Sequence, residues 1–283
     1  VRAFPEENKA VIQKLLPRRS KFSRKEAGEK TKEQIVAANV DTVFLMTSLN
    51  QDFNIRRLER YIVLAKQSKA DAVIILSKSD LCENVEDIIA EVKTVSKDIP
   101  VHVVSSLTGA GLDELREYFE GNKTITIMGS SGVGKSTFTN ALLGYDKMKV
   151  KDTTEYKDKG LHTTTHRELV LLPEGGLIID TPGMREIQLW ESNDGIEEAF
   201  DEIEALMENC KFSDCSHSNE PGCAVLEALE TGELDRDRYN SFLKLKRESQ
   251  YFERRHNKKL QIDERKKWKA ITKSVRKHNK YKR

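Results

Sequence analysis

A glycine-rich segment after a short apolar run carries the clearest chemistry in the sequence. The run 124–129 leads into the pattern G-x-x-x-x-G-K-[ST], which places backbone N–H groups around phosphates at the positive end of a helix dipole. The pattern therefore predicts a loop that binds the phosphates of a nucleotide. Its residues are Gly129, Ser130, Ser131, Gly132, Val133, Gly134, Lys135 and Ser136, and Thr137 follows them in the predicted helix.

Four residues in and beyond this loop predict how a triphosphate is held. Lys135 is expected to reach the β- and γ-phosphates, and the Ser136 hydroxyl is expected to ligate Mg²⁺. Asp180 ends the apolar run 177–179, where a carboxylate can hold the metal directly or through water. The N–H of Gly183 is expected to face the γ-phosphate. This set predicts a nucleoside triphosphatase rather than a passive nucleotide binder.

The segment Ser77-Lys78-Ser79-Asp80 resembles the N-K-x-D element with which GTPases read guanine. The carboxylate of Asp80 is expected to accept two bonds from guanine N1 and N2, while the stem of Lys78 covers the ring. Adenine lacks this donor pair and would leave the carboxylate unpaired. Ser77 stands where most GTPases have Asn, so the bond that ties this loop to the nucleotide site is expected to be shorter or lost. Modest nucleotide affinity would follow.

A second segment predicts the same base. Ser105 and Ser106, at the start of the stretch 105–109, resemble the S-A-x element whose backbone N–H meets guanine O6. Both segments end predicted strands, at the edge where α/β sheets bind their ligands. Together they favour guanine. An ATPase is the alternative, and it predicts that Asp80→Asn leaves the choice of nucleotide unchanged.

A separate group of residues predicts a metal site. The pattern Cys-x4-Cys-x-His-x5-Cys offers three thiolates and one imidazole, the donor set of a closed tetrahedral Zn²⁺ site. The surrounding residues are too polar for a buried core, which argues against free thiols packed inside the protein. Four ligands leave no open position, so the zinc is expected to be structural. The predicted ligands are Cys210, Cys215, His217 and Cys223.

These residues need a scaffold, and the sequence predicts an α/β fold for it. Short β-branched runs alternate with longer amphipathic stretches, a pattern typical of a doubly wound, mostly parallel sheet. Residues 196–256 are expected to be mainly helical around the cysteines. Strands are predicted at 40–48, 72–77, 101–106, 124–129, 168–173 and 176–183, and helices at 55–69, 85–97, 111–121 and 135–144.

The motifs occur in an unusual order. In ordinary GTPases the phosphate loop comes first and the base-reading elements come last, whereas here the base-reading elements precede the loop. A sheet domain with neighbouring termini tolerates such a permutation, because each strand still occupies the same place. The segment after Asp180 then runs directly into the cysteine-rich region, so nucleotide state can be transmitted covalently to that region.

The permuted order, the segment Gly160-Leu161-His162-Thr163-Thr164-Thr165 and the cysteine pattern together resemble the bacterial small-ribosomal-subunit-dependent GTPases. The resemblance covers nearly the whole chain. It implies a Mg²⁺-dependent GTPase that acts in late maturation of the small ribosomal subunit, binds its rRNA and is stimulated by it. Members normally begin with an OB-fold domain, and residues 1–22 are expected to hold its last strands.

The resemblance also implies roles in hydrolysis. Many GTPases place a Gln after D-x-x-G to orient the attacking water, but here that position is Met184, which cannot hydrogen-bond water usefully. His162 is the best substitute and is expected to be catalytic, beside Lys135. Thr164 is expected to complete the Mg²⁺ shell in the GTP state.

The charge distribution supports a polyanionic partner. The formal net charge of the 283 residues is only +2, yet residues 1–32 carry net +6, residues 33–243 net −17 and residues 244–283 net +13. The basic C-terminal end also carries aromatic residues at helical spacing. An acidic catalytic domain between basic ends favours binding to nucleic acid, with strong salt dependence.

The same analysis predicts three domains and a cellular setting. We expect a partial OB-like segment with a basic linker at 1–32, a permuted GTPase domain at 33–192 and a helical zinc-binding domain at 193–283. Neither a long apolar run nor a signal peptide is visible, and few cysteines are present, which predicts a cytoplasmic protein without a membrane span, by default a monomer. The alternative function is a GTP-gated nucleic-acid-binding switch with negligible turnover.

Overall fold

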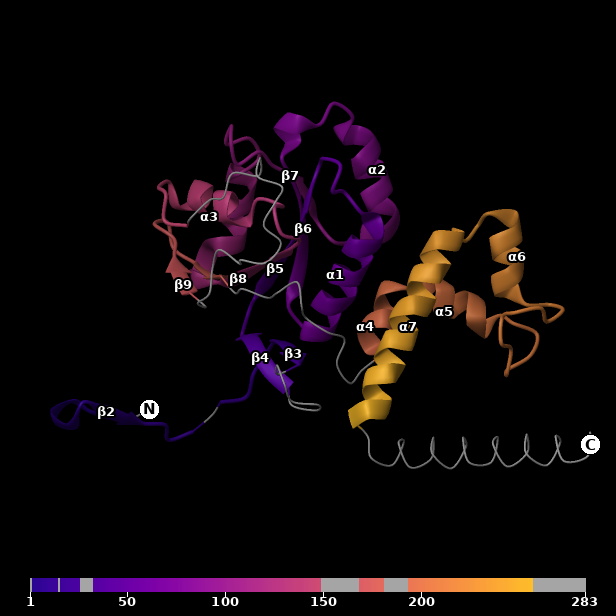
Figure 1. The fold of residues 1–283 in the computed structure, drawn as a ribbon, viewed down its shortest axis with the longest axis horizontal. Helices are drawn as coiled ribbons and strands as arrows, with labels where there is room; N and C mark the ends of the chain where they lie inside the picture. Colours follow the sequence, from indigo (N-terminus) through magenta and orange to yellow (C-terminus); the bar gives the residue numbers. More distant parts are fainter. Residues whose placement is uncertain (1, 15, 26–32, 149–167, 181–192, 257–283) are drawn as a thin grey trace, which may run out of the picture.

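A six-stranded sheet forms the centre of the protein in the computed structural model, which describes residues 2–14, 16–25, 33–148, 168–180 and 193–256 (Figure 1). The strand order is β7-β6-β5-β8-β10-β9, and only β9 runs antiparallel to its neighbour. The predicted mostly parallel α/β sheet is therefore confirmed. The strands are β5 (Thr42–Ser48), β6 (Asp71–Ser77), β7 (Val101–Val103), β8 (Thr124–Gly129), β9 (Glu168–Leu171) and β10 (Leu177–Asp180).

Apolar side chains leave both faces of the central strands, so the sheet has a core on each side. On β5, Val43 and Leu45 belong to one buried cluster, and Phe44 and Met46 belong to the other. Helices α1 (Ile55–Ser68) and α2 (Val85–Ser96) contribute to the first cluster, while α3 (Lys135–Leu143) and the short helix η3 (Asp113–Asn122) contribute to the second. Burial on both faces explains why β5 reads as a continuous apolar run rather than an alternating one.

Two predicted elements differ from the structure. The helix expected over 111–121 is a 3-10 helix over Asp113–Asn122, interrupted at Glu120, which is extended, and at Gly121, whose φ is +71°. The strand expected over 101–106 ends at Val103. The chain then turns into the loop that carries Ser105, which accepts a bond from Thr108 N at 3.2 Å. Polar residues in a tight loop take the backbone bonds that a longer strand would have used.

Two antiparallel hairpins precede the sheet. The first joins β1 (Arg2–Phe4) and β2 (Lys9–Val11) through the 3-10 helix η1 (Pro5–Glu7), and it extends away from the body of the protein (Figure 1). Neither of its strands has a buried residue. The second joins β3 (Lys21–Lys25) to β4 (Glu33–Ala38), so its two strands lie on opposite sides of the domain boundary predicted at residue 32.

The C-terminal lobe consists of α4 (Asp194–Ala199), α5 (Asp201–Glu208), α6 (Ala224–Thr231) and α7 (Arg236–His256). It packs against α1, and buried residues of α4 to α7 belong to the same cluster as α1 and α2. Gly195 lets α4 approach closely, because a Cβ there would lie 2.8 Å from the Val63 carbonyl oxygen. The GTPase sheet and the C-terminal lobe therefore share one continuous core on this side.

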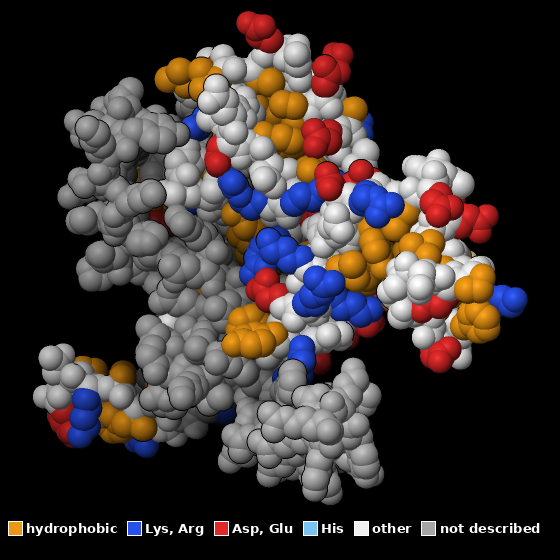
Figure 2. All heavy atoms as spheres, turned by 45° about the vertical axis from the view of Figure 1, so that its right-hand side comes forward, with side chains coloured by type: hydrophobic (Ala, Val, Ile, Leu, Met, Phe, Trp, Pro, Cys, Tyr) orange, Lys and Arg blue, Asp and Glu red, His pale blue; other side chains and the backbone are white. Residues whose placement is uncertain are grey.

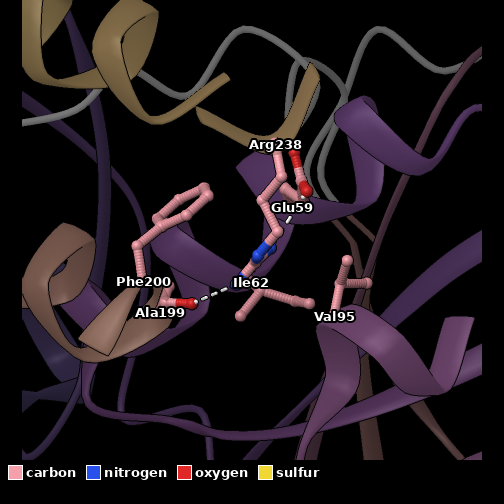
Figure 3. A pocket seen from close by; sticks show the side chains of 6 residues that line it. All are labelled: Glu59, Ile62, Val95, Ala199, Phe200 and Arg238. Atoms are coloured by element: carbon pink, nitrogen blue, oxygen red, sulfur yellow. Dashed lines mark hydrogen bonds and ion pairs between the residues drawn. The ribbon is translucent and has the colours of Figure 1, made fainter. Parts of the chain in front are cut away.

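A buried ion pair joins the two parts at this interface. Arg238 on α7 donates to Glu59 on α1 at 3.0 Å, to Glu202 at 2.6 Å and to the Ala199 carbonyl at 2.9 Å. The Arg238 guanidinium also lies 4.5 Å from the centre of the Phe200 ring. Figure 3 shows the Arg238 side chain pointing toward Ile62 of α1, between Phe200 and Val95.

The surface of this region is strongly charged. In the view that brings the C-terminal lobe forward, Lys and Arg side chains gather across the middle of the face, near α7 (Figure 2). Within the described residues, no helix has both the length and the apolar character needed to cross a membrane.

Candidate nucleotide site and metal centre

The predicted phosphate loop connects β8 to α3, the strand-to-helix geometry that its mechanism requires. Gly132 and Gly134 have φ values of +80° and +103°, a region that residues with a Cβ rarely adopt. Gly129 is needed for a different reason: a Cβ there would lie 2.6 Å from the carbonyl oxygen of Met46 on the neighbouring strand. The glycines thus give the loop its curvature and let it sit tightly against the sheet edge.

Lys135 lies in the first turn of α3 and folds over the loop. Its Nζ donates to the carbonyl oxygens of Gly129 at 3.0 Å and of Ser130 at 2.6 Å. The ammonium group is therefore held at the mouth of the loop, where the positive end of the α3 dipole also lies. Ser136 and Thr137 follow it in the same turn.

The first base-reading segment is bound directly to the phosphate loop. The Ser77 hydroxyl is 1% exposed and lies 2.9 Å from the Val133 carbonyl oxygen and 3.2 Å from that of Thr47. Lys78 Nζ donates to the Gly132 carbonyl oxygen at 2.8 Å. The tie that was expected to be shorter or lost in the absence of Asn is therefore made by the serine, because β6 ends close enough for a short side chain to reach the loop.

The second base-reading segment meets the first. The Ser105 hydroxyl donates to Asp80 Oδ1 at 2.5 Å, and the backbone N–H of Ser79 donates to the Val104 carbonyl at 3.2 Å. Asp80 is exposed, and Ser106 is half-buried beside Ser105. The structure thus brings both predicted segments to one side of the phosphate loop, with the Asp80 carboxylate oriented by Ser105.

The remaining residues predicted at the site divide into two groups. Asp180 is the last residue of β10, half-buried, opposite Glu168 in the register with β9 and on the strand next to β8. The predicted catalytic and switch residues His162 and Thr164, together with Gly183 and Met184, lie outside the described residues.

Asp52, in the connection from β5 to α1, is a polar contact of the loop that sequence reasoning missed. Its Oδ2 accepts a bond from the Ser130 hydroxyl at 2.8 Å and an ion pair from Arg57 at 2.8 Å. The bond from Arg57 is the main reason that the pKa of Asp52 lies below its ordinary value, and Ser130 lowers it further. Its place at the carboxyl end of a strand beside β8 was the available signal.

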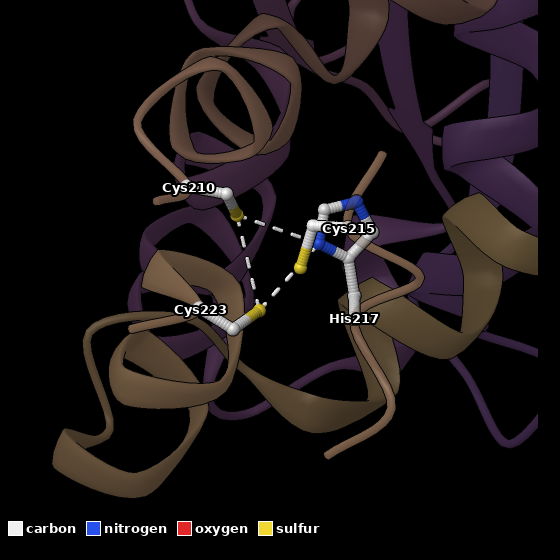
Figure 4. A group of neighbouring side chains, drawn as sticks. All are labelled: Cys210, Cys215, His217 and Cys223. Carbon is white, nitrogen blue, oxygen red and sulfur yellow. Dashed lines mark hydrogen bonds between the residues drawn. The ribbon is translucent and has the colours of Figure 1, made fainter. Parts of the chain in front are cut away.

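The predicted metal ligands converge between α5 and α6 (Figure 4). Their ligand atoms all lie within 4.8 Å of one another. Cys210 Sγ is 3.8 Å from Cys223 Sγ, and His217 Nδ1 is 3.5 Å from each of these sulfurs. A regular tetrahedron with ordinary zinc bond lengths gives about 3.8 Å between two sulfurs and about 3.5 Å between sulfur and nitrogen. The Cys215, Cys210, Cys223 and His217 cluster is therefore compatible with one Zn²⁺.

Backbone groups support the ligands. Burial raises the pKa of Cys210, but N–H groups of Val225 and Ala224 near the start of α6 outweigh it, so the net pKa is lowered. A thiol that ionises more easily is a better metal ligand. Cys215 differs: burial is the main cause that raises its pKa to about 11.

Glu220 organises the loop that carries two of the ligands, another feature that the motif did not predict. Its Oε2 accepts the N–H groups of Ser218 at 2.9 Å and Asn219 at 3.1 Å, and Oε1 accepts that of Ser216 at 3.0 Å as well as the Ser216 hydroxyl. The hydroxyl and these amides lower the pKa of Glu220 to about 2. His217, in the middle of this loop, has a positive φ of 56°.

Comparison with known proteins agrees with this geometry. The sequence model of the RsgA GTPase family matches residues 15–190, from β3 through the nucleotide site. The chain belongs to the RsgA GTPase family. It is therefore a GTP-hydrolysing enzyme, and the guanine-reading segments and the phosphate loop lie within the matched region.

Relatives and solved structures extend the match beyond that region. The chain is 46% identical over 261 residues to the small ribosomal subunit biogenesis GTPase RsgA of Opitutus terrae, covering 92% of this chain and 71% of that protein. It is 45% identical to RsgA 1 of Oceanobacillus iheyensis, covering 95% and 77%.

Among solved structures, YjeQ from Thermotoga maritima is similar with a TM-score of 0.60 and 30% identity, over 85% of this chain and 78% of that one. YloQ, a circularly permuted GTPase, is similar with a TM-score of 0.54 and 26% identity, over 82% and 80%. The predicted permutation of the GTPase domain is thus confirmed.

Proposed function

We propose that this GTPase acts in maturation of the small ribosomal subunit, binds its rRNA and hydrolyses GTP faster when bound to it. The observation that carries the proposal is the direct bonding of the base-reading segment to the phosphate loop, from Ser77 to Val133 and from Lys78 to Gly132. The relatives named above are small ribosomal subunit biogenesis GTPases. The basic N- and C-terminal segments support a polyanionic partner.

In this proposal the residues of the site divide the work. The loop from Gly129 to Ser136 and Thr137 holds the phosphates, while Ser77 to Asp80 with Ser105 and Ser106 read guanine. Mg²⁺, when bound with the nucleotide, supplies charge stabilisation at the β- and γ-phosphate oxygens. Ser136, Asp180 and Thr164 would hold it.

For hydrolysis, we assign His162 to orienting the attacking water, Lys135 to stabilising charge on the γ-phosphate and the N–H of Gly183 to facing it. Met184 offers no hydrogen bond for water, which is why the role passes to another residue. The zinc is structural, because the four ligands close its coordination. We also propose that the protein works in the cytoplasm as a monomer.

The experiment is GTP turnover by the full chain with and without purified small ribosomal subunits. A large stimulation is expected, and large subunits serve as the control. Equal turnover in the presence and absence of small subunits would contradict the proposal and would leave the alternative, a GTP-gated switch whose main activity is binding. The variant His162→Ala is expected to lose turnover and to keep GTP binding.

A further inference from the structure

Helix α7 has two faces of different character. Tyr239, Phe242, Leu245 and Ser249 are buried, and their face packs into the core shared with α1. The exposed face is a single stripe that recurs every three or four residues and spans five helical turns, about 27 Å. We define the α7 stripe as Arg236, Asn240, Lys244, Arg247, Tyr251 and Arg254, all of which are exposed.

The α7 stripe is cationic and has few anionic neighbours on its own helix. Within the described part of the chain, Arg236, Lys244 and Arg247 make no ion pair. The Glu248 carboxylate is turned to the side and pairs with Arg60 of α1 at 2.6 Å. Tyr251, 48% exposed, is an aromatic side chain in the same row. Figure 2 shows Lys and Arg side chains gathered in this part of the surface.

We propose that the α7 stripe is a surface on which RNA docks, with its cations on backbone phosphates and Tyr251 stacked on a base. This inference rests on the proposed function, because it identifies where the rRNA binds. A straight row of cations complements a row of phosphates. An exposed aromatic ring among cations is typical of contacts with unpaired bases.

Other partners fit the stripe less well. A helix that docks on a protein usually presents two or more large apolar anchors, and the stripe has only Tyr251. A helix that binds a membrane surface inserts its apolar face, but the apolar face of α7 is already buried against the protein. The charge complement of RNA thus accounts for both faces of the helix.

The test uses the full zinc-loaded chain and a fluorescein-labelled RNA stem-loop, with affinity measured by anisotropy at several KCl concentrations. Neutralising two phosphate contacts in the double variant Lys244→Gln/Arg247→Gln is expected to reduce the slope of log K against log salt by roughly 1.5. Tyr251→Ala is expected to weaken binding without changing the slope. Lys93→Gln, an exposed lysine on α2, removes a charge elsewhere and is expected to leave both unchanged.

The outcomes separate the two proposals. If the wild type binds the stem-loop and the double variant keeps the wild-type slope, the α7 stripe is wrong and the proposed function stands. If the wild type does not bind RNA and is not stimulated by small subunits, both fail. Polyglutamate that displaces the RNA as well as unlabelled RNA of equal charge does would show a general polyanion surface and overturn the assignment to RNA. Zinc content and GTP affinity equal to wild type confirm that the variants fold.

Discussion

Arg238 Nη1 on α7 lies 3.0 Å from Glu59 Oε1 on α1, and only 1% of the Glu59 side chain is exposed. The pair joins the GTPase domain to the C-terminal lobe across 179 residues of sequence. Arg56 also donates to Glu59 Oε1, at 2.5 Å, and reaches Asp235 just before α7 at 2.6 Å. A buried carboxylate in such a network is stable only while its cationic partners remain.

Removing the Arg238 guanidinium is therefore expected to destabilise the protein. In Arg238→Met the Glu59 charge loses its buried partner, and the free energy of unfolding is expected to fall by about 3 kcal/mol, measured by urea denaturation of the zinc-loaded chain. The surface pair between Lys66 and Glu198 is the control, since Lys66→Met is expected to cost under about 1 kcal/mol. The double variant Glu59→Leu/Arg238→Met is expected to recover much of the loss. Equal stability of Arg238→Met and Lys66→Met would contradict this account.

The hydroxyl of Ser77 is expected to matter for nucleotide affinity. Ser77→Ala removes the bond to Val133 and leaves that carbonyl without this donor, so the Kd for GTP is expected to rise about fivefold, measured with a fluorescent GTP analogue. Ser48→Ala is the matched control, because Ser48 is equally buried at the end of the neighbouring strand but bonds to Asn50 instead. A similar Kd for both variants would show that the tie is unimportant.

Motifs of contiguous residues account for what the sequence predicted well. The phosphate loop and the cysteine cluster are short patterns whose chemistry is set by residue type and spacing, and the structure brings their described members together as expected. The sheet was predictable because its strands are buried on both faces and so read as apolar runs. By contrast, the interrupted 3-10 helix at Asp113–Asn122 has an amphipathic pattern that a helix of either type would share.

The contacts that were missed depend on tertiary structure. Glu59 and Arg238 have the sequence appearance of ordinary charges on helix surfaces, and only the packing of α7 on α1 buries them. The effect of Ser77 was underestimated because the distance from the end of β6 to the phosphate loop is not written in the motif. Asp52 reaches Ser130 for the same reason, from a loop that carries no pattern of its own.

Asp80 is expected to select the base. In Asp80→Asn the carboxylate that would accept from guanine N1 and N2 becomes an amide, so the preference for GTP over ATP is expected to fall by about 100-fold. Xanthine carries an oxygen where guanine has its amino group, so the amide introduced by this substitution can donate to it. Competition assays should therefore show that the variant prefers xanthosine triphosphate to GTP. An unchanged preference for GTP in this variant would refute the assignment of Asp80.

The cysteine cluster is expected to bind one zinc per chain. Metal analysis of the purified protein should give a stoichiometry near one, and Cys210→Ser is expected to abolish it, because three ligands hold the ion far more weakly than four. Cys82→Ser is the control, since Cys82 is half-buried but not part of the cluster. Zinc retained in full by Cys210→Ser would contradict the predicted ligand set.

Glu220 is expected to control how firmly the zinc loop holds its metal. Its carboxylate gathers the N–H groups of Ser216, Ser218 and Asn219, and a Gln side chain has only one oxygen to accept them. Glu220→Gln should therefore release zinc faster to a chromogenic chelator, whereas Glu230→Gln, an exposed glutamate on α6, should release it at the wild-type rate.

The pKa of Glu220, lowered from 4.5 to about 2, also fixes the pH dependence of this effect. A carboxyl group with a depressed pKa stabilises the folded loop fully above its ordinary pKa, and this contribution is lost only as the pH falls toward about 2. Between about pH 6 and about pH 8 the ratio of the release rates of Glu220→Gln and wild type should therefore be constant. A ratio that changes over this range would mean that another titrating group, and not the Glu220 carboxylate, holds the loop.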